Sequence, residues 1–245
     1  MAQTVIERKL SAIYNAKGLP AFLEACKEVV TTSQFRGENV SPVERGGICE
    51  LVLQRILQTY FKVSGVQGSF FRSVVLKDQT GRGSYAGRYN EIDGVIVSPG
   101  YLMAVECKSY RGNMRLVDRG TLTDGKTRTI DLYAQSLSHK SILTAYAKQL
   151  ALPDKRAGLP VLYVGFLYAQ SKVRDDRTEV AKREFPILTQ SELMGLLSRM
   201  EKRFAEPVFD YQRACDVFGK CSRSRVLHDK HADYVGYERK GSNGK

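Results

Sequence analysis

Two apolar segments, residues 89–97 and 101–107, follow each other closely in this chain, and only Ser98, Pro99 and Gly100 separate them. β-Branched, aromatic and other apolar residues dominate both, and a Pro-Gly turn between such segments predicts a β-hairpin. Apolar side chains fall on both alternating faces of the two predicted strands. Strands of this kind lie in a sheet that is covered on both sides. The hairpin therefore predicts the centre of an α/β fold.

Polar residues stand at one end of this hairpin. A loop centred on residues 99–100 places Asp93 across from Glu106. Side-chain alternation puts Lys108 on the face of Glu106 and Cys107 on the opposite face. The two acids would lie roughly 5 Å apart at their Cβ atoms, and a hard divalent cation relieves the repulsion between them. A Glu-x-Lys triplet is usually a solvated surface pair, but at the end of so buried a strand it predicts a metal site with a lysine beside it.

This pattern carries a family resemblance. Asp93-x12-Glu106-x-Lys108 resembles the PD-(D/E)xK nucleases, the restriction-endonuclease-like superfamily, although Ile92 replaces the proline of that name. More narrowly, segments 90–97 and 105–112 resemble the core of the nuclease-related (NERD) domain. The resemblance covers about residues 41–200. It implies an α/β restriction-endonuclease-like core, a mixed β-sheet flanked by helices on both faces. It also implies Mg²⁺, for which Mn²⁺ can substitute, bound by Asp93, Glu106 and the backbone carbonyl of Cys107.

Two further polar residues enter through the resemblance. The family has a Gly-x-x-Gly-Glu-like element on a preceding helix, which residues 46–50 match loosely, and a glutamine early in the following helix, which Gln135 matches. Glu50 is thereby a candidate catalytic group and further metal ligand, and Gln135 a candidate catalytic group. From the residues alone, an ordinary helix-surface acid is an equally good interpretation of Glu50. For Gln135, a surface glutamine is the better interpretation from the residues alone. We expect His139, one turn beyond Gln135, to be a packed or surface histidine rather than a base.

Charge indicates the partner. The chain has 38 Lys and Arg against 26 Asp and Glu, a formal net charge of +12, and such a surplus favours a polyanionic partner. Nucleic acid, DNA rather than RNA, is the partner we expect. No apolar run approaches the ~20 residues that span a bilayer, and no signal-peptide pattern or basic amphipathic helix is present. We therefore expect a cytoplasmic protein with no membrane partner, and a homodimer stays open. Five cysteines without regular spacing fit reduced thiols.

The remaining patterns divide the chain into three parts. We expect an N-terminal helical extension over 1–40, a nuclease-like α/β core over 41–204 and a basic, partly disordered C-terminal extension over 205–245 with no strong helical period. Core helices are predicted at 41–60, 131–150 and 189–203, and further strands at 68–77, 159–169 and 185–188. Two basic, glycine-containing segments, 78–88 and 111–126, would be loops beside the cleft. They are inert connections or bind nucleic acid through Arg82, Arg88, Arg111 and Arg115.

The C-terminal extension holds zinc ligands by type, Cys215, Cys221, His228 and His231. Their spacing is not that of a common zinc finger, so we do not expect structural Zn²⁺ there. A zinc-stabilised interaction protein is nevertheless one alternative function.

The function expected is that of a metal-dependent nuclease. Asp93 and Glu106 would hold Mg²⁺ while Lys108 assists the attacking water in hydrolysing phosphodiester bonds, in DNA by preference. A non-catalytic nucleic-acid-binding module on the same fold is the main alternative. The intact Asp93, Glu106 and Lys108 set favours catalysis over that alternative.

Overall fold

The computed structural model describes residues 4–32, 34–79, 89–110, 113–126, 128–155, 157–169 and 173–222 of the chain. Its helices are α1 (Val5–Thr31), α2 (Pro42–Ser64), α3 (Leu132–Leu150), α4 (Glu179–Glu184), α5 (Gln190–Arg203) and α6 (Tyr211–Cys221). Its strands are β1 (Gln34–Phe35), β2 (Glu38–Asn39), β3 (Ser69–Lys77), β4 (Tyr89–Val97), β5 (Leu102–Tyr110), β6 (Met114–Val117), β7 (Thr121–Thr123), β8 (Thr129–Asp131), β9 (Val161–Ala169), β10 (Val173–Asp175) and β11 (Ile187–Leu188).

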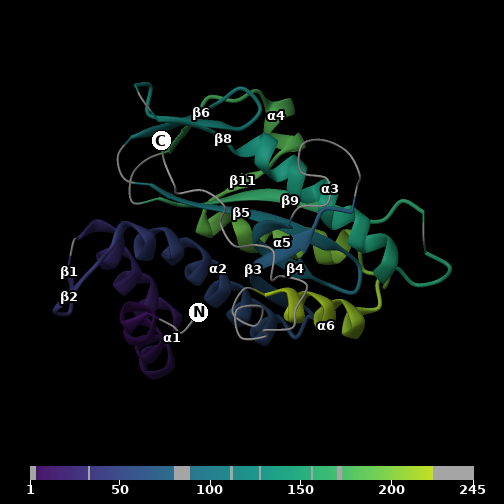
Figure 1. Ribbon diagram of the computed structural model, residues 1–245, viewed down its shortest axis with the longest axis horizontal. Helices are drawn as coiled ribbons and strands as arrows, with labels where there is room; N and C mark the ends of the chain where they lie inside the picture. Colours follow the sequence, from purple (N-terminus) through teal and green to yellow (C-terminus); the bar gives the residue numbers. More distant parts are fainter. Residues whose placement is uncertain are drawn as a thin grey trace, which may run out of the picture.

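The central sheet has the strand order β11-β9-β5-β4-β3 (Figure 1). Strands β3, β4 and β5 are antiparallel neighbours, whereas β5, β9 and β11 run parallel. The predicted hairpin is the β4–β5 pair, and its register, Val97 with Leu102 through Gly94 with Val105, centres the loop on residues 99–100 as expected. The sheet is therefore mixed, and the hairpin lies at its middle.

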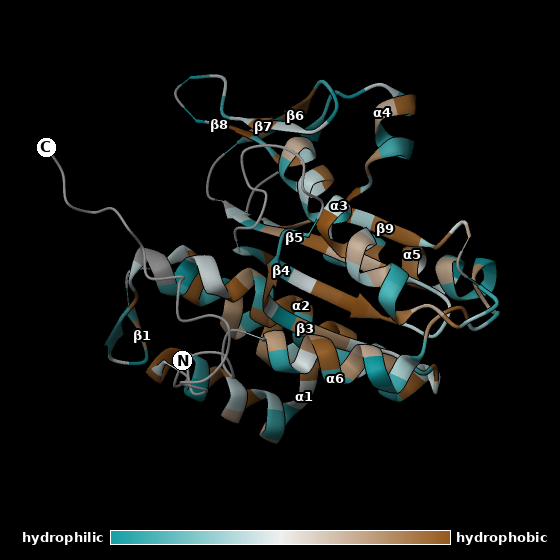
Figure 2. Cartoon of the chain, turned by 45° about the vertical axis from the view of Figure 1, so that its right-hand side comes forward, coloured by the Kyte–Doolittle hydropathy of each residue, from teal (hydrophilic) through white to brown (hydrophobic). Residues whose placement is uncertain are grey.

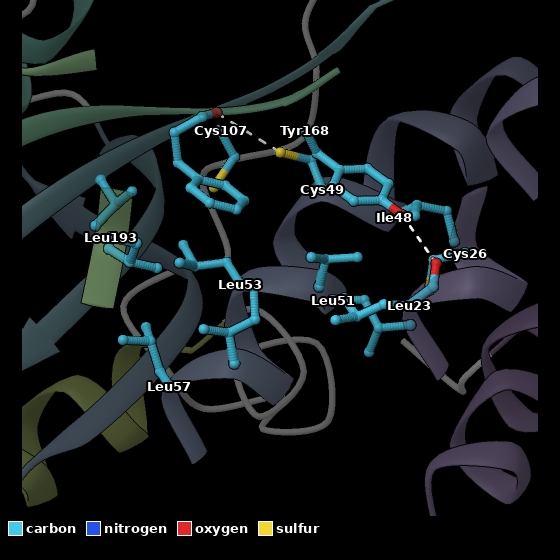
Figure 3. Packing of buried hydrophobic residues seen from close by; sticks show 14 of the residues in the cluster. Leu23, Cys26, Ile48, Cys49, Leu51, Leu53, Leu57, Cys107, Tyr168 and Leu193 are labelled. Carbon is cyan, nitrogen blue, oxygen red and sulfur yellow. Dashed lines mark hydrogen bonds between the residues drawn. The ribbon is translucent and has the colours of Figure 1, made fainter. Parts of the chain in front are cut away.

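Helices cover both faces of this sheet. On one face, α2 and α5 pack on apolar residues of β5 and β9, and α1 packs on α2 (Figure 3). On the other face, α3 and α6 pack on β3, β4, β5 and β9. Apolar residues line the facing sides of these elements (Figure 2). The mixed sheet with helices on both faces confirms the predicted restriction-endonuclease-like α/β core.

Local signals fix several helix boundaries as predicted. Ser41 and Glu44 form a capping box at the start of α2, with the Glu44 N–H donating to Ser41 Oγ at 3.1 Å and the Ser41 N–H to Glu44 Oε2 at 3.0 Å. At the start of α5, both the backbone N–H and the hydroxyl of Thr189 donate to Glu192 Oε2 at 2.7 Å. Helix α1 is interrupted at Gly18, whose φ of 76° is non-helical, and this break divides the predicted N-terminal helical extension into two helical parts.

A second, four-stranded sheet, β10-β6-β7-β8, lies beyond the end of β5. The sequence predicted an irregular loop over 111–126, and that prediction was wrong for the described part of the segment. Met114, Leu116 and Leu122 are buried against Phe185 and Leu132. Alternate residues thus supply one apolar face, which is sufficient for strands even though the composition is polar.

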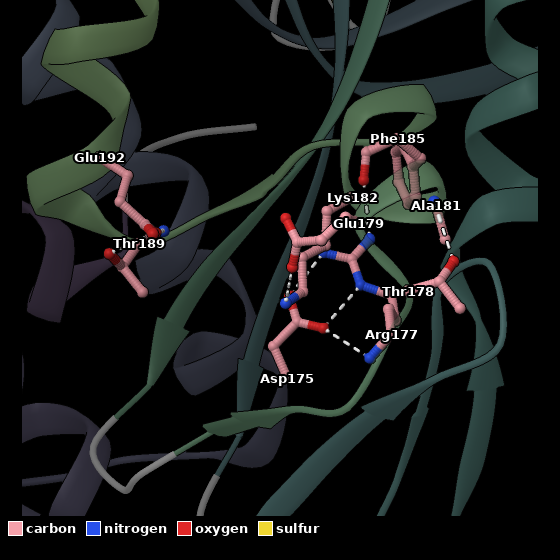
Figure 4. A network of polar contacts seen from close by, with 9 residues as sticks. All are labelled: Asp175, Arg177, Thr178, Glu179, Ala181, Lys182, Phe185, Thr189 and Glu192. Carbon is pink, nitrogen blue, oxygen red and sulfur yellow. Dashed lines mark hydrogen bonds and ion pairs between the residues drawn. The ribbon is translucent and has the colours of Figure 1, made fainter.

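A buried arginine fastens this second sheet to the core (Figure 4). The Arg177 side chain is 1% exposed and donates from Nη2 to Asp175 Oδ2 at 2.7 Å and from Nη1 to the Phe185 carbonyl at 2.7 Å. Breaking such a pair would leave a buried charge uncompensated. Arg177 therefore ties the end of β10 to the segment that leads into β11.

Helix α6 was not predicted, because residues 205–245 were expected to lack a helical period. Asp210 caps the helix by accepting from the Arg213 N–H at 3.0 Å, and Ala214 and Phe218 are fully buried on the sheet. We therefore propose that the folded core extends to Ser222 rather than ending near residue 204. In the described ranges, no helix has the length and apolar character needed to cross a membrane.

Candidate functional site

The site lies where the central strands β4 and β5 separate. Their backbone pairing ends at Gly94 and Val105, one pair short of Asp93 and Glu106. Beyond this point the Asp93 carboxylate takes the place of a backbone acceptor, since its Oδ2 accepts from the Cys107 N–H at 2.8 Å. The Asp93 side chain is thus fixed at the point of separation, next to the predicted partner residue.

Lys108 lies between the two carboxylates. Its Nζ donates to Glu106 Oε1 in a short contact and lies 3.4 Å from Asp93 Oδ2. The Glu106 side chain is 4% exposed, whereas those of Asp93 and Lys108 are about a quarter exposed. The ammonium therefore offsets the repulsion between two acids in a partly dehydrated position. The structure brings Asp93, Glu106 and Lys108 together as the sequence predicted.

The second carboxylate oxygen of Glu106 faces a histidine that was not among the predicted site residues. His139 Nδ1 on α3 lies 3.1 Å from Glu106 Oε2. Both atoms are buried and face each other at ion-pair distance, and neither has another hydrogen-bond partner among the described residues. His139 was expected to be a packed or surface residue. Its position one turn after Gln135 was the only sequence signal, because its partner depends on how α3 crosses the sheet.

Burial and charge act differently on the two acids. Burial and the neighbouring Glu106 charge raise the pKa of Asp93, against the lowering effects of Lys108 and the Cys107 N–H. Burial would also raise the pKa of Glu106, but contacts with His139 and Lys108 outweigh it and lower that pKa. The surroundings therefore favour the ionised form of Glu106, whereas they disfavour the ionised form of Asp93.

A third acid, Glu50 on α2, lies close enough for the Asp93 charge to act on it. Its Oε2 accepts from Ser73 Oγ at 2.9 Å and from Arg72 Nε at 3.2 Å. Burial raises the pKa of Glu50 to about 7, with Arg72 opposing and Asp93 adding to the shift. Glu50 is thus a half-buried acid in a polar network rather than an ordinary helix-surface acid.

The other predicted site residues are less closely associated with the two acids. Gln135 is exposed on α3, and among the described residues no hydrogen bond joins it to the acids. Arg115 is exposed and its Nη2 pairs with Asp176 Oδ2 at 2.6 Å. The Cys107 thiol is buried on the α2 side of the sheet, as alternation predicted. Arg82, Arg88, Arg111, His228 and His231 lie outside the described residues, whereas Cys215 and Cys221 are half-buried on α6.

The donors at this site fit a hard divalent cation. Glu106 offers a buried oxygen, Oε2, whose neighbour at 3.1 Å is His139 Nδ1, and Asp93 supplies a second carboxylate beside it. Within the described ranges, no three His, Cys, Asp or Glu side chains form a ready-made cage. Mg²⁺ usually takes only one or two carboxylates and keeps several of its waters, so Asp93 and Glu106 are the side chains here that could hold it.

Comparison with known proteins connects this geometry to one family. The family model described as the nuclease-related domain, NERD, matches residues 46–167. The matched segment contains Glu50, Asp93, Glu106, Lys108 and His139, and it leaves out α1, α5 and α6. Neither the curated proteins nor the solved structures gave a match.

Proposed function

Because the chain belongs, through residues 46–167, to the nuclease-related (NERD) domain family, we propose that it is a metal-dependent nuclease that hydrolyses phosphodiester bonds in DNA. The observation that carries the proposal is the cluster of Asp93, Glu106 and Lys108 where β4 and β5 separate. Two acids and a lysine are collected there between the central strands of a buried sheet, which is a costly arrangement for a group with only a structural role.

Asp93 and Glu106 would hold the metal, with the backbone carbonyl of Cys107 as a further ligand and Glu50 as a fourth candidate. When bound, Mg²⁺ or Mn²⁺ would polarise the scissile phosphate and lower the pKa of a coordinated water. His139 would keep Glu106 Oε2 in a fixed direction. The Cys107 N–H fixes Asp93 Oδ2 in the same way.

Lys108 is the group we assign to the chemical step. Its ammonium already lies at both carboxylates, so it would remain beside a phosphate drawn to the same place. A fixed cation there offsets the negative charge that develops on the phosphate oxygens, or orients the attacking water. Gln135, one turn before His139, would act on substrate or water from the exposed rim.

The net charge of +12 supports a polyanionic substrate. We assign phosphate contacts to Arg82, Arg88, Arg111 and Arg115, of which Arg115 must first exchange its Asp176 partner. Such contacts position the backbone without reading bases. We therefore expect DNA cleavage with little sequence preference.

The test is cleavage of circular and linear DNA by the full chain with Mg²⁺, Mn²⁺ or EDTA. Asp93→Asn and Glu106→Gln keep the shape of each acid but remove a metal ligand, so each should lower the single-turnover rate by at least about 10²-fold. Glu201→Gln is the matched control, because Glu201 is a half-buried acid bonded to Tyr101 Oη at 2.7 Å and outside the cluster. DNA binding without cleavage under every condition would favour the non-catalytic alternative.

A further inference from the structure

One arginine joins the first helix to the candidate site. Arg72 on β3 donates from Nη2 to Glu7 Oε1 at 2.6 Å and from Nε to Glu50 Oε2 at 3.2 Å. Glu7 belongs to α1 and Glu50 to α2, so a single guanidinium bridges the two helices. The three side chains are only 16–28% exposed, and solvent screens their interaction less than it would that of a surface pair.

The acceptor at each end of this bridge is itself held in place. The Glu7 N–H donates to Thr4 Oγ1 at 3.1 Å, which fixes the first turn of α1. At the other end, Ser73 donates to the same oxygen of Glu50 that accepts from Arg72. Ser73 has a φ of 49°, a left-handed conformation that is uncommon for a non-glycine residue inside a strand. Ser73 also lies between the ladder pairs that flank Asp93, Arg72 with Gly94 and Val74 with Ile92.

Helix α1 lies outside the segment that matches the family, residues 46–167. Its apolar residues nevertheless share one buried cluster with α2 and the sheet. Core packing therefore accounts for the attachment of α1, but it does not require a charged residue at position 7. The Glu7 carboxylate is directed at Arg72, which also binds Glu50.

We propose that Glu7 is a positioning residue of the nuclease site, which acts through Arg72 to hold the Glu50 carboxylate beside Asp93. The first helix is then a working part of the site rather than an appended extension. This inference rests on the proposed function.

The physical reason is the fixed geometry of the guanidinium. It presents its donors in a rigid planar fork, in which Nε now donates to Glu50 and Nη2 to Glu7. Without the Glu7 charge, Arg72 keeps Glu50 as its carboxylate partner and is free to turn toward a bidentate pair. Such a pair would engage both Glu50 oxygens and draw them away from Asp93.

The experiment compares two variants that each remove one ion pair of α1. Glu7→Gln removes the pair with Arg72. Glu38→Gln removes the pair between Lys9 Nζ and Glu38 Oε1, 2.8 Å long, which ties α1 to β2 and does not involve Glu50. Mn²⁺ affinity is measured by titration calorimetry on the full chain, with thermal melts alongside. The same measurements are repeated for Glu50→Gln and for the Glu7→Gln, Glu50→Gln double variant.

We expect Glu7→Gln to melt close to Glu38→Gln but to weaken Mn²⁺ binding about 10-fold or more, as is typical when the partner of a ligand is lost. In the Glu50→Gln background, Glu7→Gln should have no further effect, since its role passes through Glu50. Equal Mn²⁺ affinities for Glu7→Gln and Glu38→Gln, or additive effects in the double variant, would overturn the inference alone. A parent protein that neither binds Mn²⁺ nor cuts DNA would overturn the proposed function, and this inference with it.

Discussion

Replacing Glu50 with glutamine should change how the stability of the protein depends on pH. Burial, with a contribution from Asp93 and against the effect of Arg72, raises the pKa of Glu50 from 4.5 to about 7 in the folded protein. In the unfolded chain the side chain returns to its ordinary pKa. Between pH 4.5 and 7 the folded state therefore keeps a proton that the unfolded state has released. This contribution to stability is complete below pH 4.5 and is lost as the pH rises through 7.

The size of the effect follows from the same displacement. At about 1.4 kcal/mol for each pH unit, a pKa that moves from 4.5 to about 7 corresponds to about 3 kcal/mol. The side chain is only 19% exposed, so solvent removes little of this value. We expect the free energy of unfolding of the parent to fall by up to about 3 kcal/mol relative to that of Glu50→Gln between pH 4.5 and 8.

Urea unfolding of both proteins at pH 5, 6, 7 and 8, in the presence of EDTA, measures this difference. Other titrating groups, including Asp93 and Glu106, are common to the two proteins and largely cancel when one curve is subtracted from the other. The Arg72 contact favours the ionised form of Glu50 and is already included in the raised pKa, so it belongs to the pH-dependent difference. A difference that does not vary with pH would show that Glu50 is not a buried acid with a raised pKa, and the assignment of its environment would be wrong.

Three further changes test other parts of the structure. Lys108→Ala should lower the rate of single-turnover cleavage by about 10²-fold or more. Its Mn²⁺ affinity, measured by calorimetry, should stay equal or rise, because a cation that competes with the metal is removed. Lost metal binding with unchanged cleavage would contradict the role of Lys108. His139→Phe should weaken Mn²⁺ binding by about 10-fold, whereas Gln135→Ala should leave it unchanged. A larger loss of Mn²⁺ affinity for Gln135→Ala than for His139→Phe would show that Gln135, rather than His139, orients the metal ligands. Phe218→Ala should lower the free energy of unfolding by about 3–5 kcal/mol, since the ring is fully buried; urea unfolding beside the exposed control Lys220→Ala checks this, and equal curves would show that α6 is not part of the core.

The elements that the sequence predicted correctly depend on neighbours in the chain. The capping boxes at Ser41 and Thr189 each join residues three positions apart. The hairpin register follows from its loop, because a turn of fixed length sets which residues face each other. Such features are specified locally and remain the same whatever packs around them.

The parts that were missed depend on distant partners or on an overlooked period. The apolar residues of α6 that pack on the sheet recur at helical spacing: Tyr211, Ala214, Phe218 and Cys221. The sequence therefore contained a helical period, which the basic composition of the C-terminal extension obscured. His139 offered no such signal. Its contact with Glu106 arises only because α3 crosses the sheet beside β5, and an order of residues along one helix does not specify that crossing.

The site itself depends on a departure from strand alternation. Ile92 and Ile96 have the same parity, yet Ile92 packs in the cluster beneath α6 and Ile96 in the cluster beneath α2. The alternation of side chains between the two faces is therefore inverted in β4 at Asp93 and Gly94. At the same level, Ser73 on the neighbouring strand adopts a φ of 49°. A Cβ on Gly94 would come within 2.4 Å of the Phe70 ring, so only glycine lets that ring cover the inversion. Without the inversion, β4 would stay paired with β5 and the Asp93 carboxylate could not reach the Cys107 N–H. A spacing pattern can predict which acids meet, but not that the sheet must open to let them do so.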